Sequence, residues 1–376
     1  MKPGIKFGIY LSLTLTGILT AAAPGDSLIW AGINAWYNYE TAQSVAILDS
    51  ARRLYPEHPT VHLVYAAARY QHSQASAPVE DNYRVLAADL AEIIPIYENL
   101  IERYPELPVY RLYYGSAIGL KARIHLGRKE WISTLWSAYR GFSIIRKVAR
   151  DNPDLIDAQL PIGIVEYYSG LSGGLVKLAA GMFGLEPSVM TGREAILRAA
   201  DQGEFAWMEA KGIIIYLYLY IENNPEAALR HARTLVATFP GNWYYHQLLT
   251  QCYLAAGDVQ NGRRALEWIA EHFDALSATN KTNFTGYLNY EWAHFYYLQD
   301  DWGQALVYLD RSIDGYRAEL DAVLAEALLL KGRILDARGE RVGAVQCYRE
   351  VIALDNFSHT IRLAEQHLRM PYRPDN

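Results

Sequence analysis

The chain has 376 residues, of which 51% are hydrophobic and 20% are charged, and its formal net charge is −6. This composition excludes an intrinsically disordered chain, which has too few apolar residues to bury a core. The acidic balance disfavours a nucleic-acid partner, because phosphate binding needs a clustered basic surface. We therefore expect a folded chain with an extensive core and no nucleic-acid ligand.

The N-terminus has the order of a secretory signal peptide. Two lysines precede an apolar stretch over 7–19, and small residues follow at 21–23. The apolar stretch is too short to span a bilayer comfortably. Because Pro24 disfavours cleavage directly after Ala23, we expect cleavage after Ala22 and export to the periplasm or cell envelope. The alternative is an uncleaved anchor, and this segment is then the only membrane contact that we expect.

A recurring motif that contains proline follows the signal. The stretch RLYPEHPTVHLVY (53–65) recurs as RYPELPVYRLYY (103–114), with looser copies at 150–160 and 237–249. The prolines are spaced by 49, 48 and 87 residues, and the last interval spans two units. Each proline ends one helical pattern and opens the next. The pattern predicts a helical array with long units in its first half.

Small residues form a second repeating pattern in the C-terminal half. Alanines that follow turn sequences recur at spacings of 37, 40 and 39, namely Ala228, Ala265, Ala305 and Ala344. In the last unit Gly332, Gly339, Ala344 and Tyr348 stand at the eighth, fifteenth, twentieth and twenty-fourth positions of a helix–turn–helix repeat. With this pattern the chain resembles the tetratricopeptide repeat family, here in an exported bacterial protein. Small residues allow the two helices of a unit to approach, and stacked units bury the stripes that neither helix buries alone.

The resemblance implies an all-α, right-handed α-solenoid of about eight helix pairs, with longer repeats in the N-terminal half and a C-terminal capping helix. The expected pairs are 25–58, 60–106, 108–154, 155–205, 207–241, 243–276, 287–319 and 322–356, and the cap is 358–370. The predicted organisation is a signal peptide (1–22), an array with a Gly-rich insertion (23–273), a linker (274–286), and C-terminal repeats with the cap (287–376).

The Gly-rich insertion lies within residues 163–203. This segment is similar to one in the eukaryotic tetratricopeptide family linked to inclusion-body clearance, with Lys177-Leu178 and Gly184 in similar places. An acidic–basic pair expected before Gly192 is replaced by EPSVMT, so we expect a shared structural variation and not a shared function. The run SGLSGGLVK lacks the Gly-Lys-Ser/Thr ending of a phosphate loop, and no strand precedes it. We interpret it as a turn between helices.

The segment GIIIYLYLYIENNP (212–225) alternates like a strand from Tyr216 to Tyr220, but all nine residues from Ile213 to Ile221 are apolar or aromatic. Asn224 can cap a following helix, Pro225 suits its first position, and Glu226 favours its N-terminal dipole. The preceding residues are therefore predicted to be the first helix of a repeat. A helix that is apolar all round must be covered on every side.

The sequence contains no convincing catalytic or metal-binding set. His58 and His62 have the spacing of two zinc ligands on one helix face, but Pro59 lies between them and no third ligand is evident. Cys252 and Cys347 stand in apolar helical contexts, and we interpret them as buried thiols. We expect no enzymatic activity, no cofactor and no metal.

Aromatic residues are the remaining candidates for function, with 29 tyrosines and 9 tryptophans in the chain. They cluster in the predicted first helices, which line the concave face of such an array. The candidate binding residues are Tyr113, Tyr114, Tyr167, Tyr168, Tyr216, Tyr220, Trp243 and Tyr244. Tyr and Trp offer large apolar area with one polar tip. The main hypothesis is a scaffold that binds a protein or peptide; the alternative is a glycan or small ligand in an aromatic cavity. Packing between repeats would also account for these residues.

Overall fold

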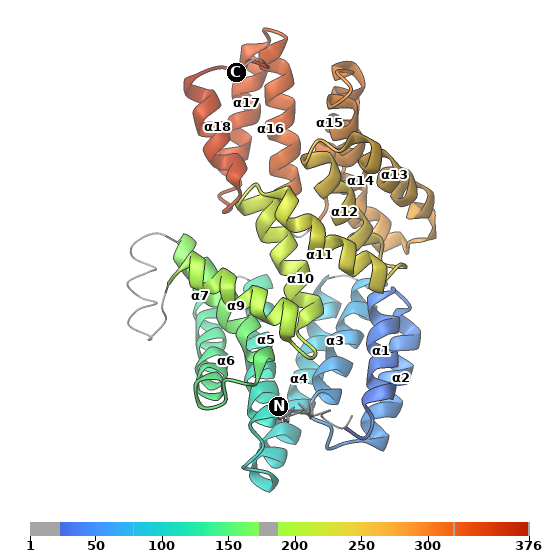
Figure 1. Ribbon diagram of the computed structural model, residues 1–376, viewed down its shortest axis with the longest axis vertical. Helices are drawn as coiled ribbons and strands as arrows, with labels where there is room; N and C mark the ends of the chain where they lie inside the picture. The colour runs from blue at the N-terminus through green and yellow to red at the C-terminus, as the bar shows by residue number, and fades with distance from the viewer. Residues whose placement is uncertain (1–22, 78, 129, 173–186, 319, 375–376) are drawn as a thin grey trace, which may run out of the picture.

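The computed structural model describes residues 23–77, 79–128, 130–172, 187–318 and 320–374. Over these residues the fold is a succession of helix pairs that wind around a common axis (Figure 1). The predicted all-α solenoid of eight pairs with a C-terminal capping helix is confirmed. The predicted signal peptide lies outside the described residues. In the described part of the chain, no helix combines the length and the apolar character needed to cross a membrane.

The first four pairs contain the longest helices. They are α1 (Asp26–Tyr37) with α2 (Thr41–Leu54), α3 (Val61–Gln74) with α4 (Val79–Arg103), α5 (Pro108–Gly127) with α6 (Trp131–Asp151), and α7 (Gln159–Leu171) with α9 (Val189–Gln202). A 3₁₀ turn, η1 (Ile156–Ala158), precedes α7. The predicted Gly-rich turn, with Lys177-Leu178 and Gly184, lies outside the described residues, so its resemblance stays a prediction.

The other four pairs are more compact. They are α10 (Trp207–Tyr216) with α11 (Pro225–Thr238), α12 (Trp243–Ala255) with α13 (Val259–His272), α14 (Ala278–Tyr297) with α15 (Trp302–Asp314), and α16 (Ala322–Ala337) with α17 (Arg341–Ala353). The 3₁₀ turn η3 (Phe273–Ala275) follows α13, and the capping helix α18 (His359–Arg369) packs on the last pair.

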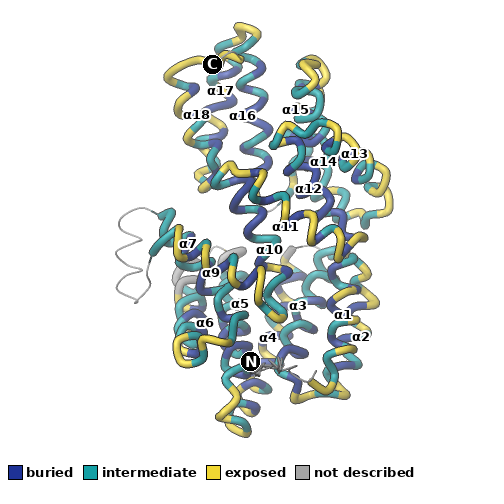
Figure 2. The backbone as a smooth tube through the Cα atoms, in the orientation of Figure 1, coloured by how far each residue is buried: buried dark blue, intermediate teal, exposed yellow. Residues whose placement is uncertain are grey.

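The two helices of a pair differ in burial. Ten of the thirteen residues of α12 are buried, whereas α13 buries only Gly262, Leu266 and Ile269. First helices are enclosed by neighbouring repeats, and second helices keep one side in solvent (Figure 2). Stacking thus creates the core that an isolated pair lacks.

The predicted linker at 274–286 differs from the structure. Residues from Ala278 onward form the first turns of α14, and the Ser277 hydroxyl caps this helix by accepting a hydrogen bond from the Asn280 N–H. The polar composition that suggested a linker is that of a capped helix start. One continuous core runs from Ile29 to Ile334 across this position.

The apolar segment after Gly212 is helical, as predicted, but it ends in a wider turn. Residues Leu217–Ile221 form a π-helix, η2, and the Asn224 side chain then caps α11 by accepting from the Ala227 N–H. Leu217, Leu219 and Tyr220 are buried. A π turn re-aims side chains within a helix and often marks a functional position.

The array curves so that the start of the sixth repeat contacts the end of α1. The Asn242 side-chain amide donates to the carbonyl of Tyr37 at 2.7 Å, and the Gly241 N–H donates to the Asn38 side chain at 2.9 Å. Trp30 of α1 also stacks on Phe205. These contacts close the first five repeats into a ring, and the remaining repeats continue above it (Figure 1).

Candidate binding channel

Three of the predicted aromatic residues belong to the core. The Tyr167 hydroxyl donates to Glu222 Oε1 at 2.9 Å, and the Trp243 indole N–H donates to the carbonyl of Ile269 at 2.8 Å. Tyr220 is 1% exposed, and its hydroxyl is 3.4 Å from Gln251 Oε1. These residues join neighbouring helices in the core, which is the packing role that the sequence also allowed, and their role in binding stays a prediction.

Two others lie in the N-terminal repeats. Tyr113 is buried, accepts a hydrogen bond from the Thr60 hydroxyl at 3.0 Å, and lines an internal cavity. Tyr114, on the neighbouring position of α5, instead donates to Glu98 Oε1 at 3.0 Å. Tyr113 therefore stays a candidate, whereas Tyr114 braces α5 against α4.

The structure brings together Tyr168, Tyr216 and Tyr244. They come from α7, α10 and α12 and line one cavity of 620 Å³, which we call the aromatic cavity. Five further aromatic residues line this wall and are not among the predicted candidates; they are Trp36, Tyr37, Tyr39, Tyr70 and Tyr245. Two of these, Trp36 and Tyr37, end the first helix of the first repeat, which is the signal that could have identified them.

A second cavity of 460 Å³, the apolar cavity, lies between α1, α3, α5, α6, α7 and α10. Aliphatic side chains such as Ile33, Leu63, Leu112 and Ile164 form most of its wall. Trp36, Tyr37, Ala67, Leu120, Ile164 and Glu209 line both cavities. The two cavities therefore adjoin and together form the inner channel of the ring.

Hydroxyl and carboxyl groups of the apolar cavity are already engaged within the protein. The Tyr37 hydroxyl donates to Glu209 Oε1 at 2.7 Å, and the Ser116 hydroxyl donates to the Leu112 carbonyl at 3.0 Å. Asp157 accepts hydrogen bonds from two backbone N–H groups at 2.7 and 3.0 Å. Burial raises the pKa of Glu209 and of Tyr37, which favours the uncharged form of both groups. This wall suits an apolar ligand.

The wall of the aromatic cavity includes a polar atom that can still accept a hydrogen bond. The buried side-chain oxygen of Gln71 has no hydrogen-bond partner among the described residues, and Gln71 lines this cavity. A buried polar atom without a partner costs about 1–3 kcal/mol, so a donor from a ligand would recover that free energy. Arg123 lies on the same wall, where its guanidinium donates to the Tyr70 hydroxyl.

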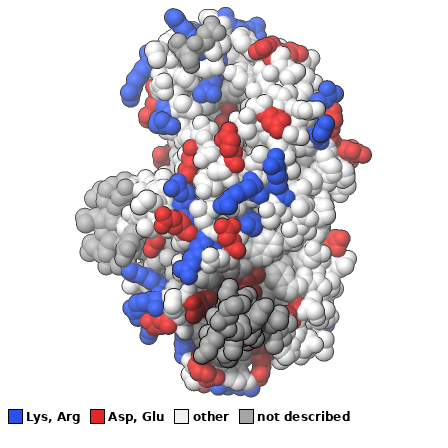
Figure 3. All heavy atoms as spheres, viewed as in Figure 1, with Lys and Arg blue, Asp and Glu red and all other residues white. Residues whose placement is uncertain are grey.

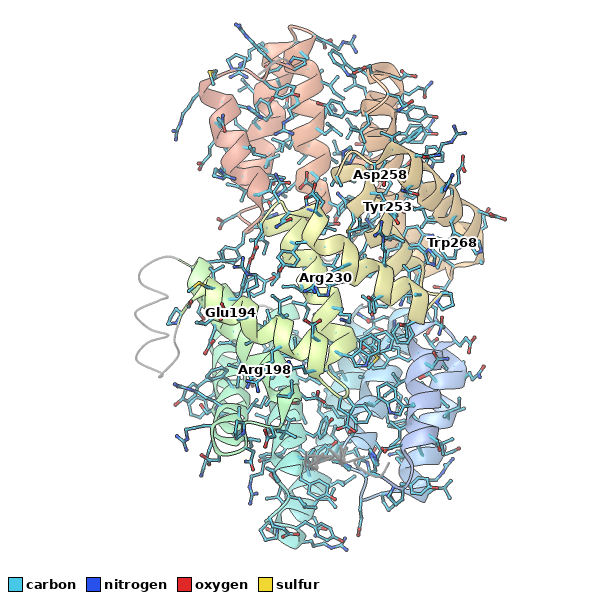
Figure 4. All side chains as sticks on the ribbon, in the orientation of Figure 1. Glu194, Arg198, Arg230, Tyr253, Asp258 and Trp268 are labelled. Atoms are coloured by element: carbon cyan, nitrogen blue, oxygen red, sulfur yellow. The ribbon has the colours of Figure 1, made fainter. Side chains whose placement is uncertain are left out.

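The outer surface has a different character from the channel. Acidic and basic side chains are interspersed on the face seen in Figure 3. Arg198 on α9, Arg230 on α11 and Trp268 on α13 lie on this face, outside the channel (Figure 4). The charged side chains of this face contrast with the mostly apolar and aromatic walls of the two cavities.

The two histidines considered as zinc ligands have other partners. The His58 Nε2 lies 2.7 Å from Asp26 Oδ1, and the His62 Nε2 donates to the carbonyl of Pro56 at 2.7 Å. Within the described ranges, no three His, Cys, Asp or Glu side chains are grouped as metal ligands. Both histidines fasten the entry of α3.

The chain has distant similarity to solved structures of other proteins. No protein-family model matches the sequence, and no curated protein matches it either. Similar solved structures include human IFIT1 with m7Gppp-AAAA, with a TM-score of 0.42 and 14% identity over 90% of this chain and 80% of that one. They also include a tetratricopeptide repeat protein from Parabacteroides merdae, with a TM-score of 0.31 and 12% identity over 82% and 99% of the two chains.

The tetratricopeptide domain of P58(IPK) is a further similar structure, with a TM-score of 0.26 and 11% identity over 92% and 98% of the two chains. The helical-repeat fold is shown by the helix pairs of this chain. At these identities and TM-scores the similar structures carry no argument about its function. The nucleotide ligand is a property of the IFIT1 structure, and the absence of a nucleic-acid partner here stays a prediction.

Proposed function

We propose that the protein is a non-catalytic binding scaffold whose inner channel takes up an apolar segment of a partner polypeptide. The observation that carries this proposal is the pair of adjoining cavities within the closed ring. Their combined wall comes mainly from the first helices of six successive repeats. Such a wall presents a continuous surface to an extended chain, in which alternate side chains can enter separate cavities.

The chemistry of the wall favours a polypeptide over a glycan. A glycan needs many hydrogen bonds, and the hydroxyl and carboxyl groups of the apolar cavity are engaged with protein atoms. Burying sugar hydroxyls there without partners would cost several kcal/mol. Apolar side chains meet no such cost, and a peptide N–H can donate to the unpartnered oxygen of Gln71.

We place this activity in the periplasm or cell envelope, on the basis of the signal-like order of residues 1–22. The test is the N-terminal sequence of the protein recovered from fractionated cells. A chain that begins after Ala22 in the envelope fraction supports the placement. A chain that begins at Met1 in the cytosolic fraction contradicts it, without bearing on the channel.

Two glycines allow the channel to be filled selectively. A Cβ at Gly119, which lines the apolar cavity, or at Gly212, which lines the aromatic cavity, would meet no atom within 4 Å. Both lie inside helices, where replacement of glycine by a good helix former is favourable by up to about 1 kcal/mol. Gly119→Leu and Gly212→Leu should therefore fold while they narrow the channel. Gly303→Leu, on the exposed start of α15, is the matched control.

The experiment replaces Tyr216 with the photoreactive residue p-benzoylphenylalanine and identifies cross-linked peptides in the producing cells by mass spectrometry. The proposal expects one reproducible peptide sequence with apolar side chains, lost in Gly119→Leu and retained in Gly303→Leu. Cross-links that are unchanged in both glycine-filled variants would show that the partner does not enter the channel, and would overturn the proposal.

A small apolar ligand is the second candidate, and it is favoured by the mostly aliphatic wall of the apolar cavity. Its volume of 460 Å³ lies in the range of small-molecule sites. Titration with the apolar dye N-phenyl-1-naphthylamine distinguishes the two candidates. Strong dye binding that Gly119→Leu abolishes, together with no cross-linked peptide, would favour the small ligand.

A further inference from the structure

A third cavity lies outside the channel, between the C-terminal repeats and the capping helix. It has a volume of 160 Å³ and shares no residue with the channel. Its wall combines α12, α14 and α16 with α18 and the turn after η2. Polar side chains dominate this wall; they are Asn223, Gln251, Tyr290, His294, Tyr297, Glu326, Arg333 and His359. We call it the polar cavity.

Two opposite charges of the polar cavity stand apart on one helix. Glu326 and Arg333 are seven residues apart on α16, which corresponds to about 10 Å along the helix axis. They make no ion pair with each other. Glu326 Oε1 lies 3.5 Å from the His359 Nε2, and its side chain is 15% exposed. Burial raises the pKa of Glu326, whereas His359 and Arg333 lower it. The carboxyl group marks one end of the cavity, where a cation would favour its ionised form.

Arg333 marks the other end and is held in place by neutral groups. Its Nε donates to His367 Nε2 at 3.1 Å, and its guanidinium lies 5.2 Å from the centre of the Tyr372 ring. No carboxylate of the described residues lies within ion-pair distance of Arg333. Burial, with Arg333 nearby, lowers the pKa of His367 to about 4, so this partner is uncharged at neutral pH. The guanidinium is thus oriented but not neutralised.

His294 adds an unpartnered polar atom on the wall of the same cavity. Its Nδ1 is buried and has no hydrogen-bond partner among the described residues. Burial lowers the pKa of His294 to about 4, so the ring is neutral at physiological pH and adds no third charge. Buried polar atoms without partners are rare in folded proteins, and such an atom beside a polar cavity indicates a missing partner.

From this geometry we infer that the polar cavity binds a small zwitterion, such as a short amino acid, with its ammonium group at Glu326 and its carboxylate at Arg333. A cavity of about 150 Å³ holds a molecule of the size of benzene, so a ligand of about six non-hydrogen atoms fits. A zwitterion leaves no charge of either sign uncompensated, whereas a simple anion or amine satisfies one end and leaves the other buried.

The inference is independent of the proposed channel function, and calorimetry of the full mature chain tests it. β-Alanine is the zwitterionic probe, and propionate and propylamine are matched probes that each carry one of its two charges. The inference expects β-alanine to bind in the millimolar range or tighter. Propionate and propylamine should each bind at least about tenfold more weakly, because one cavity charge then stays unpaired.

Two variants complete the experiment. Glu326→Gln keeps the shape of the side chain, removes the charge at the ammonium end, and should weaken β-alanine about tenfold or more. Lys331→Gln is the control, because Lys331 lies on the same helix and pairs with Asp310 at 2.6 Å outside the cavity. No β-alanine binding to the natural chain, equal binding of propionate, or unchanged binding by Glu326→Gln would each overturn the inference.

Discussion

The side-chain amide of Gln247 on α12 donates a 2.7 Å hydrogen bond to Glu291 Oε1 on α14, and neither residue is exposed to solvent. Burial raises the pKa of Glu291 to about 8, with Gln247 opposing this and the nearby Glu326 adding to it. The carboxyl group is therefore protonated at neutral pH. It forms part of the contact between two consecutive first helices.

This contact predicts a loss of stability as the pH rises from about 4.5 to about 8. Glu291 is protonated in the folded chain up to about pH 8 and ionised in the unfolded chain above its ordinary pKa, so the free energy of unfolding falls as the pH rises between these values. The fall is at most ~1.4 kcal/mol per pH unit. His231, His246, His294 and His367 have pKa values lowered to about 4, which gives the opposite slope below their ordinary value of 6.5.

Above pH 6.5 these four histidines no longer oppose the slope from Glu291, so the window from pH 6.5 to 8 is the one to measure. Urea unfolding of Glu291→Gln should show a flatter pH dependence in this window than the natural chain. Glu267→Gln, an exposed change on α13 with a side chain that is 53% exposed, is the control and should keep the slope. Identical slopes for Glu291→Gln and the natural chain would refute the assignment of the neutral carboxyl.

A second prediction concerns two glycines that face each other across α5 and α6. A Cβ at Gly141 would come within 2.7 Å of the Gly119 amide nitrogen and of the Gly115 carbonyl oxygen, whereas a Cβ at Gly119 meets no atom within 4 Å. Gly141→Ala must push apart two backbones and should lower the free energy of unfolding by about 1–3 kcal/mol. Gly119→Ala should raise it by up to about 1 kcal/mol. Urea unfolding of both variants checks this asymmetry, and equal effects would contradict it.

A third prediction separates core from channel among the aromatic candidates. Trp243→Ala removes a fully buried ring and its hydrogen bond to Ile269, and should lower the free energy of unfolding by about 3–5 kcal/mol. Tyr216→Ala opens the wall of the aromatic cavity instead, so its cost should be smaller and its main effect should be on binding. Denaturant unfolding and titration with N-phenyl-1-naphthylamine measure the two effects. A larger stability loss for Tyr216→Ala would reverse our assignment.

A fourth prediction concerns the two thiols. Cys252 is completely buried and Cys347 nearly so, and both are free. Burial raises the pKa of Cys252 well above its ordinary value and that of Cys347 to about 11, so the reactive thiolate is scarce in both. Thiol reagents should leave the native chain unmodified at neutral pH and label both cysteines in denaturant. Rapid labelling of the native chain would show that these helices open.

The sequence by itself determined the repeats. Prolines at the ends of helices and caps such as Asn224 act over one or two turns of chain. Small residues such as Gly332 act within one repeat, where a Cβ would meet the Tyr348 ring of the second helix. The sequence does not distinguish a linker from a helix at the start of the seventh pair, because Ser277 and the polar residues after it suit a loop and a capped helix equally. Only the hydrogen bond from the Asn280 N–H to Ser277 distinguishes the two.

Only the tertiary structure decided where the channel lies. Adjacent tyrosines of α7 lie in different environments. The Tyr167 hydroxyl donates a hydrogen bond to Glu222 in the core, and Tyr168 lines the aromatic cavity. The contact of Tyr37 with Asn242 joins residues 205 positions apart and depends on small rotations that accumulate over five repeats. No local sequence pattern encodes the sum of these rotations. The closed ring, and with it the channel, is therefore a property of the whole array.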